Sequence, residues 1–154
     1  QRPCAGCSTL ESMAWNLAGF SGQVCAAMDA RRHQIYNARF QVDGQCPRRL
    51  TPDRAISLDD LVQELAGTQT PQLVVGDGAQ LCYDALTAAG IPAVLAPPNL
   101  RMQSAWGVAR QALALAQAGQ TLSPAQLVPV YHRLSQAERE RLEREQAAQT
   151  PHPQ

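Results

Sequence analysis

The sequence holds 154 residues, of which 45% are hydrophobic and 17% are charged, as in a globular domain rather than a disordered or fibrous chain. Thirteen basic residues balance thirteen acidic ones, so the whole chain has no net attraction for nucleic acid or an anionic membrane. All thirteen basic residues are arginines, which excludes mechanisms that need a lysine as Schiff-base amine, nucleophile or phosphate-loop cation.

The five cysteines, at positions 4, 7, 25, 46 and 82, favour a reducing compartment, and we expect a cytoplasmic protein. Their number is odd, and Cys25 and Cys82 lie in apolar segments where a free cysteine behaves as a small hydrophobe. Cys4 and Cys7 have the two-residue spacing of a zinc or redox knuckle. No second Cys or His pair follows at a suitable distance, so we expect no metal. No run approaches the ~20 apolar residues of a membrane helix.

The first third of the chain predicts one helix and three antiparallel strands. The stretch Ser8-Thr9-Leu10-Glu11 has the spacing of a capping box and predicts a helix over residues 9–19. Two strands are expected over 22–30 and 33–42, and in the second strand odd-numbered and even-numbered side chains face opposite ways. An Asp-Gly turn at 43–44 and a third strand within 46–57 would complete a meander, with its prolines confining that strand to an edge or bulge.

Helices alternate with short strands in the rest of the chain. Ser57 is expected to cap a helix over 58–67, and a strand over 72–75 leads into a glycine turn and a helix over 79–90. A strand over 93–96, a helix over 103–119 and a short strand over 129–133 follow. A charged helix over 135–149 and a disordered tail would end the chain. The sequence therefore predicts an α/β layered domain.

The turn between the first two strands, Asp29-Ala30-Arg31-Arg32, allows two interpretations. The arginines could form an anion site, because guanidinium groups match phosphate with two hydrogen bonds. Alternatively, Asp29 accepts backbone hydrogen bonds and pairs an arginine, which fixes the hairpin. We favour the structural interpretation, since no histidine, serine or cysteine stands at the spacing of a nucleophilic triad with Asp29.

Gly76-Asp77-Gly78 follows a predicted strand and opens a predicted helix, which makes it the best candidate for a nucleotide cradle. The turn has neither the full G-x-G-x-x-G pattern nor a lysine. A turn that only lets the strand run into the helix, with Asp77 as its cap, is the favoured alternative. The mixed charges of 138–145 fit a solvated helix face, although its narrow apolar stripe could also contact a partner protein.

The order of several stretches resembles the TsaB family, also called YeaZ, of bacterial tRNA-modification proteins. STLESMA is similar to the family's S-T-L-E-A-L-A segment, and MDARRHQIYNARF to its D-A-R-x-x-x-V-Y-x-A-x-Y hairpin. LTPDRAISLDDL, VVGDGAQLCYDAL and LVPVYHRLSQAERE resemble its proline link, its G-D-G-A turn and its P-V-Y-x-R ending. These matches run in order from residue 8 to about 142.

The resemblance implies the second lobe of a fold of the actin, sugar-kinase and Hsp70 (ASKHA) type. The first lobe of the family, which opens with an Asp-Thr-Ser strand, has no counterpart here, and the chain starts with Gln1 rather than Met. We therefore expect a C-terminal portion of a longer protein. Residues 1–21 would be the last helix of the first lobe, residues 22–134 the second lobe, and residues 135–154 the charged helix and tail.

The resemblance also implies a non-catalytic scaffold that pairs with its paralogue TsaD, the subunit that transfers threonylcarbamoyl to the adenosine next to the tRNA anticodon. The family docks TsaD mainly through the first lobe, and the ATPase TsaE joins the pair; tRNA would be contacted indirectly. We expect no catalytic site, no metal site and no membrane contact. We also expect no cofactor in this chain, with ATP or ADP bound at most at an interface with a partner. The resemblance leaves open whether the chain forms a homodimer. Asp29, Arg31 and Tyr36 would be structural residues of the hairpin. The alternative is a nucleotide-dependent enzyme of the same superfamily, a kinase or an M22-type peptidase.

Overall fold

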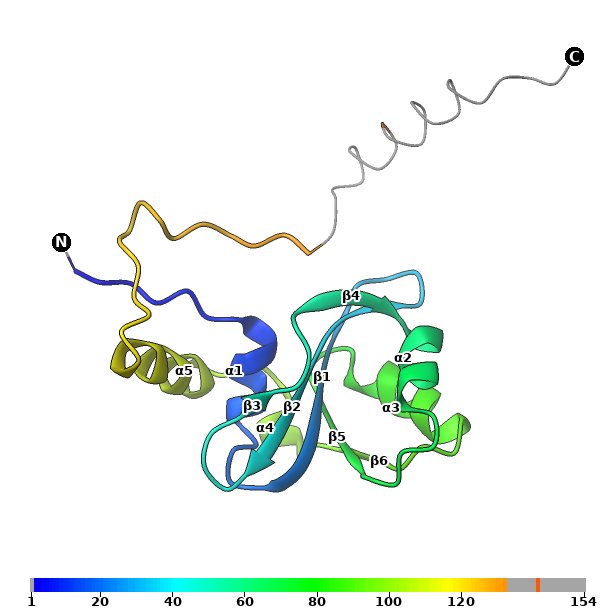
Figure 1. Cartoon of the computed structure of the whole chain (residues 1–154). Helices are drawn as coiled ribbons and strands as arrows, with labels where there is room; N and C mark the ends of the chain where they lie inside the picture. Colours follow the sequence, from blue (N-terminus) through cyan, green and yellow to red (C-terminus); the bar gives the residue numbers. More distant parts are fainter. Residues whose placement is uncertain (1, 133–140, 142–154) are drawn as a thin grey trace, which may run out of the picture.

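A computed structural model of the chain describes residues 2–132 and residue 141, and Figure 1 shows their arrangement. The elements in chain order are α1 (Thr9–Trp15), β1 (Ser21–Asp29), β2 (Gln34–Asp43), β3 (Arg48–Arg49), β4 (Arg54–Ser57), α2 (Leu58–Leu65), β5 (Gln72–Val75), α3 (Ala79–Ala88), β6 (Ala93–Leu95), α4 (Pro98–Arg101) and α5 (Ala105–Gln117). Within the described residues, no helix has the length and apolar character needed to cross a membrane. The fold is a mixed α/β fold.

One mixed sheet forms the centre of the fold, with strand order β3-β2-β1-β5-β6 and with β4 also paired to β2. β1 and β2 run antiparallel along their whole lengths, from the pair Ser21–Asp43 to the pair Asp29–Ile35. β5 pairs with β1, and β6 with β5, in parallel. Because parallel neighbours need a crossover connection, the helix α3 lies between β5 and β6 in the chain.

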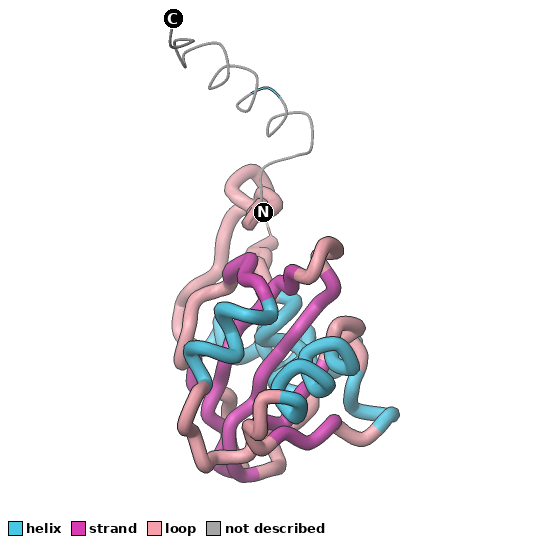
Figure 2. Tube along the Cα trace, turned by 90° about the vertical axis from the view of Figure 1, so that its right-hand side faces the viewer, coloured by secondary structure: helices cyan, strands magenta, loops and turns pink. Residues whose placement is uncertain are grey.

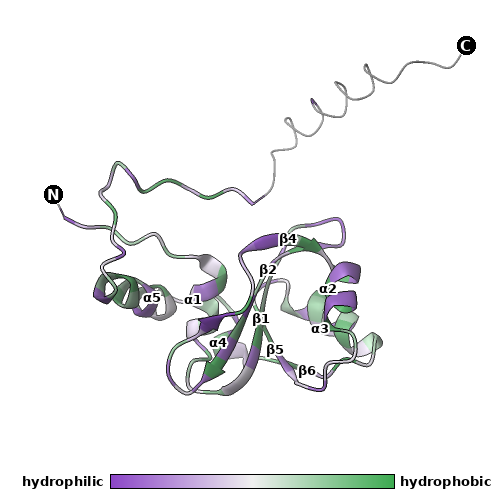
Figure 3. Cartoon of the chain, in the orientation of Figure 1, coloured by the Kyte–Doolittle hydropathy of each residue, from purple (hydrophilic) through white to green (hydrophobic). Residues whose placement is uncertain are grey.

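Helices cover both faces of the sheet, as the tube view in Figure 2 shows. Side chains of α1 pack with Val24, Phe40 and their neighbours into one buried cluster, and α5 packs on the outer side of α1. Side chains of α2 and α3 pack with Cys25 and Ile35 into a second cluster on the opposite face. The alternation predicted for 33–42 is therefore observed, and both faces of the strand are buried. Figure 3 accordingly colours much of β1 and β2 hydrophobic.

Local capping signals place the two predicted helix starts correctly. The backbone N–H of Glu11 donates to Ser8 Oγ (3.2 Å), and that of Asp60 donates to Ser57 Oγ (3.0 Å). The reciprocal half of the capping box is absent, because the Glu11 carboxylate binds Arg49 of β3 instead (2.7 Å).

Several predicted boundaries are wrong. The first helix ends at Trp15 rather than at residue 19, because the next residues make tighter bonds to the third residue before them and Asn16 turns its side chain to the carbonyls of Leu100 and Met102. The third strand is split into β3 and β4 around Pro52.

Two differences concern the second half of the chain. The helix α4 was not predicted, and residues 129–132 contain no strand. The predicted charged helix and tail over 135–154 lie outside the described residues, apart from residue 141.

Candidate functional site

The glycine turn after β5 lies directly against the end of β1. A Cβ atom added to Gly76 would stand 2.0 Å from the carbonyl oxygen of Ala27, and one added to Gly78 would stand 2.8 Å from the backbone nitrogen of Asp29. Gly76 also has φ +114°, a conformation that favours glycine. The carboxylate of Asp77 accepts a hydrogen bond from the backbone N–H of Asp29 (3.2 Å). Both glycines are needed for a close backbone approach.

Three backbone amides of this turn, those of Gly76, Gly78 and Ala79, already have acceptors. Gly76 donates to Arg101 O (2.8 Å), Gly78 to Ala27 O (3.1 Å) and Ala79 to Gly76 O (3.2 Å). A phosphate cradle at a helix start needs such N–H groups free to point at the anion. Asp77 is not the side-chain cap of α3, since Gly78 occupies the capping position. The geometry favours a structural role for the turn over a nucleotide site.

The hairpin tip between β1 and β2 has an unusual backbone. Arg31, Arg32 and His33 all have positive φ, at 61°, 55° and 58°, and their side chains are exposed. The left-handed conformation costs about 1–2 kcal/mol for each residue with a side chain. Asp29 holds the tip by accepting from the backbone N–H of Arg31 (2.6 Å), as a structural hairpin residue would. The expected ion pair with an arginine is not found within 4.0 Å among the described residues.

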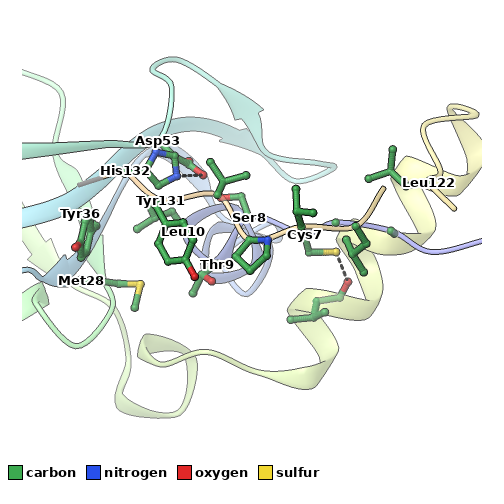
Figure 4. Close-up of a pocket in the computed structure, with 17 residues that line it drawn as sticks. Cys7, Ser8, Thr9, Leu10, Met28, Tyr36, Asp53, Leu122, Tyr131 and His132 are labelled. Carbon is green, nitrogen blue, oxygen red and sulfur yellow. Dashed lines mark hydrogen bonds and ion pairs between the residues drawn. The ribbon is translucent and has the colours of Figure 1, made fainter. Parts of the chain in front are cut away.

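A cavity of about 960 Å³ lies between the first turn of α1 and the segment 122–132 that runs back over it (Figures 1 and 4). We call it the crossover groove. It is lined mostly by apolar side chains, and Tyr36 and Met28 of the sheet lie at one end while Leu122 lies at the other (Figure 4). Tyr36, which was predicted as a structural residue of the hairpin, therefore also borders the crossover groove.

Two sets of contacts hold the segment over α1. Cys4 and Leu122 exchange two backbone hydrogen bonds of 2.8 Å each. At the other end, His132 Nε2 lies 3.9 Å from the carboxylate of Asp53. Asp53 in turn binds Arg49, which also binds Glu11 and covers the ring of Phe40 at 4.8 Å. Arg49 thus links the sheet, α1 and the groove.

The outer edge of the crossover groove exposes apolar side chains. Val128, Val130 and Tyr131 are 67%, 75% and 84% exposed. Adjacent exposed apolar residues of this kind mark interaction surfaces more often than isolated ones do. The sequence predicted a strand over 129–133 and gave no sign of the groove itself, although the apolar run Leu-Val-Pro-Val-Tyr marks the segment that forms its edge.

The groove contains no evident catalytic arrangement among the described residues. Cys7 donates to the carbonyl of Val108 (3.7 Å), and burial, together with the charge of Glu11, raises the pKa of its thiol. A raised pKa keeps the thiol protonated, and the thiol is a poorer nucleophile than the thiolate. No group of three or more His, Cys, Asp or Glu side chains in the described part of the chain could hold a metal ion.

Comparisons with known proteins found one relative by sequence and several by fold. The chain is 29% identical over 140 residues to the tRNA threonylcarbamoyladenosine biosynthesis protein TsaB of Bacillus subtilis (strain 168), a match that covers 88% of this chain and 58% of that protein. No protein-family model matches the chain. Its fold resembles YeaZ from Pseudomonas aeruginosa, with a TM-score of 0.63 and 20% identity over 85% of this chain and 61% of that one.

A second crystal structure, of an uncharacterized protein with similarity to peptidase YeaZ from Pseudomonas aeruginosa, gives a TM-score of 0.64 at 20% identity, over 86% of this chain and 60% of that one. The chain therefore has the mixed α/β fold seen in these YeaZ structures. The sequence match supports a relationship to the TsaB family, and the structural matches show the shared fold. The chain spans about three-fifths of the length of the relatives that it matches.

Proposed function

We propose that the chain is the C-terminal lobe of a TsaB-like protein with an ASKHA-type fold, and that it serves tRNA threonylcarbamoyladenosine biosynthesis as a binding subunit rather than as a catalyst. The observation that carries the proposal is the match to the Bacillus subtilis TsaB over 88% of the chain. The crossover groove supports a binding role, because it offers an apolar hollow with an exposed apolar edge.

The chemistry of the described residues supports a binding subunit over an enzyme. The thiol of Cys7, which lies in the groove, is protonated and bonded to a carbonyl. Three amides of the glycine turn, those of Gly76, Gly78 and Ala79, are bonded to the protein backbone and so are not free for a nucleotide phosphate. We therefore propose no cofactor in this chain, and place any ATP or ADP at an interface with a partner.

The partner that we propose is a TsaD-like paralogue, with a TsaE-like ATPase joining the pair and tRNA reached through them. Docking would rest mainly on the first lobe of the full-length protein. The edge of the crossover groove would add apolar contact area, because Val130 and Tyr131 are each at least 75% exposed and lose water on binding.

Co-purification tests this proposal. The full-length protein that contains this lobe is expressed with a tag beside the TsaD-like paralogue of the same genome, and co-elution is measured by size-exclusion chromatography. We expect the pair to co-elute, and the double variant Val130→Asp/Tyr131→Asp to weaken binding at least tenfold. Leu81→Asp is the matched control, because Leu81 is an exposed apolar residue on α3. Failure of the unmodified full-length protein to co-elute would refute the pairing, and full binding by the double variant would refute partner binding by this lobe.

Modified-nucleoside analysis tests the role in the pathway. The gene that encodes the chain is expressed in cells whose own TsaB-like gene is repressed, and threonylcarbamoyladenosine in total tRNA is measured by mass spectrometry. We expect the modification to be restored in proportion to complex formation. The alternative, a nucleotide-dependent enzyme or M22-type peptidase, predicts heat on calorimetric titration of the chain alone with Mg-ATP, or cleavage of peptide substrates.

A further inference from the structure

Two buried cysteines from different elements meet in the second core cluster. Cys25 lies on β1 and Cys82 on α3, both are 0% exposed, and their sulfur atoms are 3.8 Å apart. The position of α3 against β1 is fixed by a hydrogen bond from the Gly78 N–H to Ala27 O (3.1 Å). Cys82 follows one helical turn later, with its own N–H bonded to Gly78 O.

The side chain of Asn37 directs a hydrogen bond at Cys25. Arg54 donates from Nε and Nη2 to Asn37 Oδ1 (3.3 and 3.2 Å), and a guanidinium group can only donate. The oxygen of the amide must therefore face Arg54, and its NH₂ group must face inward. That NH₂ group donates to Ala26 O (2.9 Å) and to Cys25 Sγ (3.4 Å).

This arrangement separates the roles of the two sulfur atoms. Either thiol can donate the hydrogen bond between the sulfurs, but once Cys25 has lost its proton only the S–H of Cys82 can donate, and the Cys25 sulfur then accepts from both Cys82 and Asn37. The hydrogen bond from Cys82 lowers the pKa of the Cys25 thiol against the opposing effect of burial, and Asn37 and the charges of Arg39 and Arg54 lower it further. The same hydrogen bond, together with burial, raises the pKa of Cys82.

Packing alone does not explain this cluster. Two small apolar side chains would fill the same space without a polar group, whereas here a fully buried amide is held by an arginine and aimed at one sulfur. A thiolate is the reactive form of cysteine, and a second thiol in contact with it is the partner that a disulfide needs.

We propose that Cys25 and Cys82 are a redox-active pair that closes to a disulfide when a hydroperoxide oxidises the protein. The Cys25 thiolate attacks one peroxide oxygen, the O–O bond breaks, and Cys25 becomes a sulfenic acid while hydroxide leaves. Cys82 then attacks the Cys25 sulfur, and its proton and the sulfenic hydroxyl leave as water. With hydrogen peroxide, two thiols and one peroxide give one disulfide and two waters, and both electrons come from the sulfurs.

Closure requires a short approach of the two sulfur atoms. The sulfurs must approach from 3.8 Å to a bond length of about 2.05 Å, while β1 and the start of α3 stay in register. The bond would join residues 57 positions apart, which restricts the unfolded chain and raises the melting temperature of the oxidised form.

The test uses the whole chain with Cys4, Cys7 and Cys46 changed to serine, so that only the pair remains. Hydrogen peroxide is added, free thiols are blocked with N-ethylmaleimide in denaturant, and peptides are mapped by mass spectrometry. We expect a peptide that joins Cys25 to Cys82, a loss of two hydrogen atoms from the intact mass, and a higher melting temperature that dithiothreitol reverses.

Single variants separate a redox pair from two thiols that merely oxidise. In Cys82→Ser, which keeps a hydroxyl donor beside Cys25, we expect a Cys25 sulfenic acid that dimedone traps and no cross-link. In Cys25→Ser, we expect Cys82 to react at least tenfold more slowly than Cys25 does in Cys82→Ser. The peroxide dose is chosen so that it oxidises the exposed Cys46 of the unmodified chain. If Cys25 and Cys82 both remain free thiols at that dose, the proposal is wrong.

Discussion

Replacing Gly78 with alanine distinguishes a structural turn from a nucleotide cradle. The new Cβ would stand 2.8 Å from the backbone nitrogen of Asp29, whereas ordinary contacts begin at 3.4 Å. Either β1 or the start of α3 must therefore shift, and overpacking of this kind costs about 1–3 kcal/mol. No backbone strain adds to this cost, because Gly78 has φ −85°. We expect the free energy of unfolding to fall by about 1–3 kcal/mol, which lowers the melting temperature by roughly 2–12 °C in a domain of this size.

Urea unfolding followed by circular dichroism measures this change. Gly19→Ala is the matched control, since nothing lies within 4 Å of a Cβ at that position, and we expect it to stay within about 0.5 kcal/mol of the unmodified chain. If Gly78→Ala proved as stable as this control, the close approach of the turn to β1 would be wrong. If the unmodified chain bound Mg-ATP and the Gly78→Ala variant did not, the turn would be a nucleotide site.

Three further predictions concern the charged groups around the groove and the hairpin. Arg49→Met should lower the free energy of unfolding by about 1–2 kcal/mol, because it removes two ion pairs and the contact with the ring of Phe40. Arg48→Met, on the same short strand, is the control, and an equal loss of stability in both variants would contradict the reasoning. Although burial raises the pKa of Glu64, hydrogen bonds from two arginines hold it below its ordinary value. Its contribution to stability is therefore fully present above the pKa of an unfolded glutamate and lost as the pH falls through the folded pKa; Glu64→Gln should flatten this acid limb of a melting-temperature profile, and an unchanged limb would count against the ion pairs. Arg32→Gly should raise the free energy of unfolding by about 1 kcal/mol by relieving the left-handed backbone, whereas Arg32→Ala should not; thermal unfolding of both decides, and equal values would mean that no strain is present.

The sequence was most informative where structure depends on near neighbours. Ser8 and Ser57 cap their helices as predicted, because a hydroxyl three residues before a helical N–H needs nothing from the rest of the chain. The alternation of buried faces in 33–42 was also correct, since it follows from the geometry of a strand. The turn predicted at 29–32 lies between β1 and β2 as expected, but the three positive φ angles of Arg31, Arg32 and His33 were not expected, because no glycine marks them.

The crossover groove could not be read from the sequence, because it depends on contacts between distant segments. Its floor comes from residues 5–10 and its roof from 122–132, and the link between Asp53 and His132 joins positions that no local pattern connects. The apolar run before His132 has the composition of a strand, but its residues lie outside the sheet, and this run forms the edge of the groove instead. The first helix stopped early for a similar reason, since Asn16 binds carbonyls more than 80 positions away.

One packing constraint, the close approach of α3 to β1, connects the glycine turn with the cysteine pair. Gly76 and Gly78 let the turn lie against Ala27, and the amides of Gly76, Gly78 and Ala79 are used in backbone hydrogen bonds there rather than left for a phosphate. The same approach places Cys82, one helical turn further on, against Cys25 in the middle of β1. A wider junction would free the amides and separate the sulfurs. The geometry that argues against a nucleotide at this turn is therefore the geometry that brings the two thiols together.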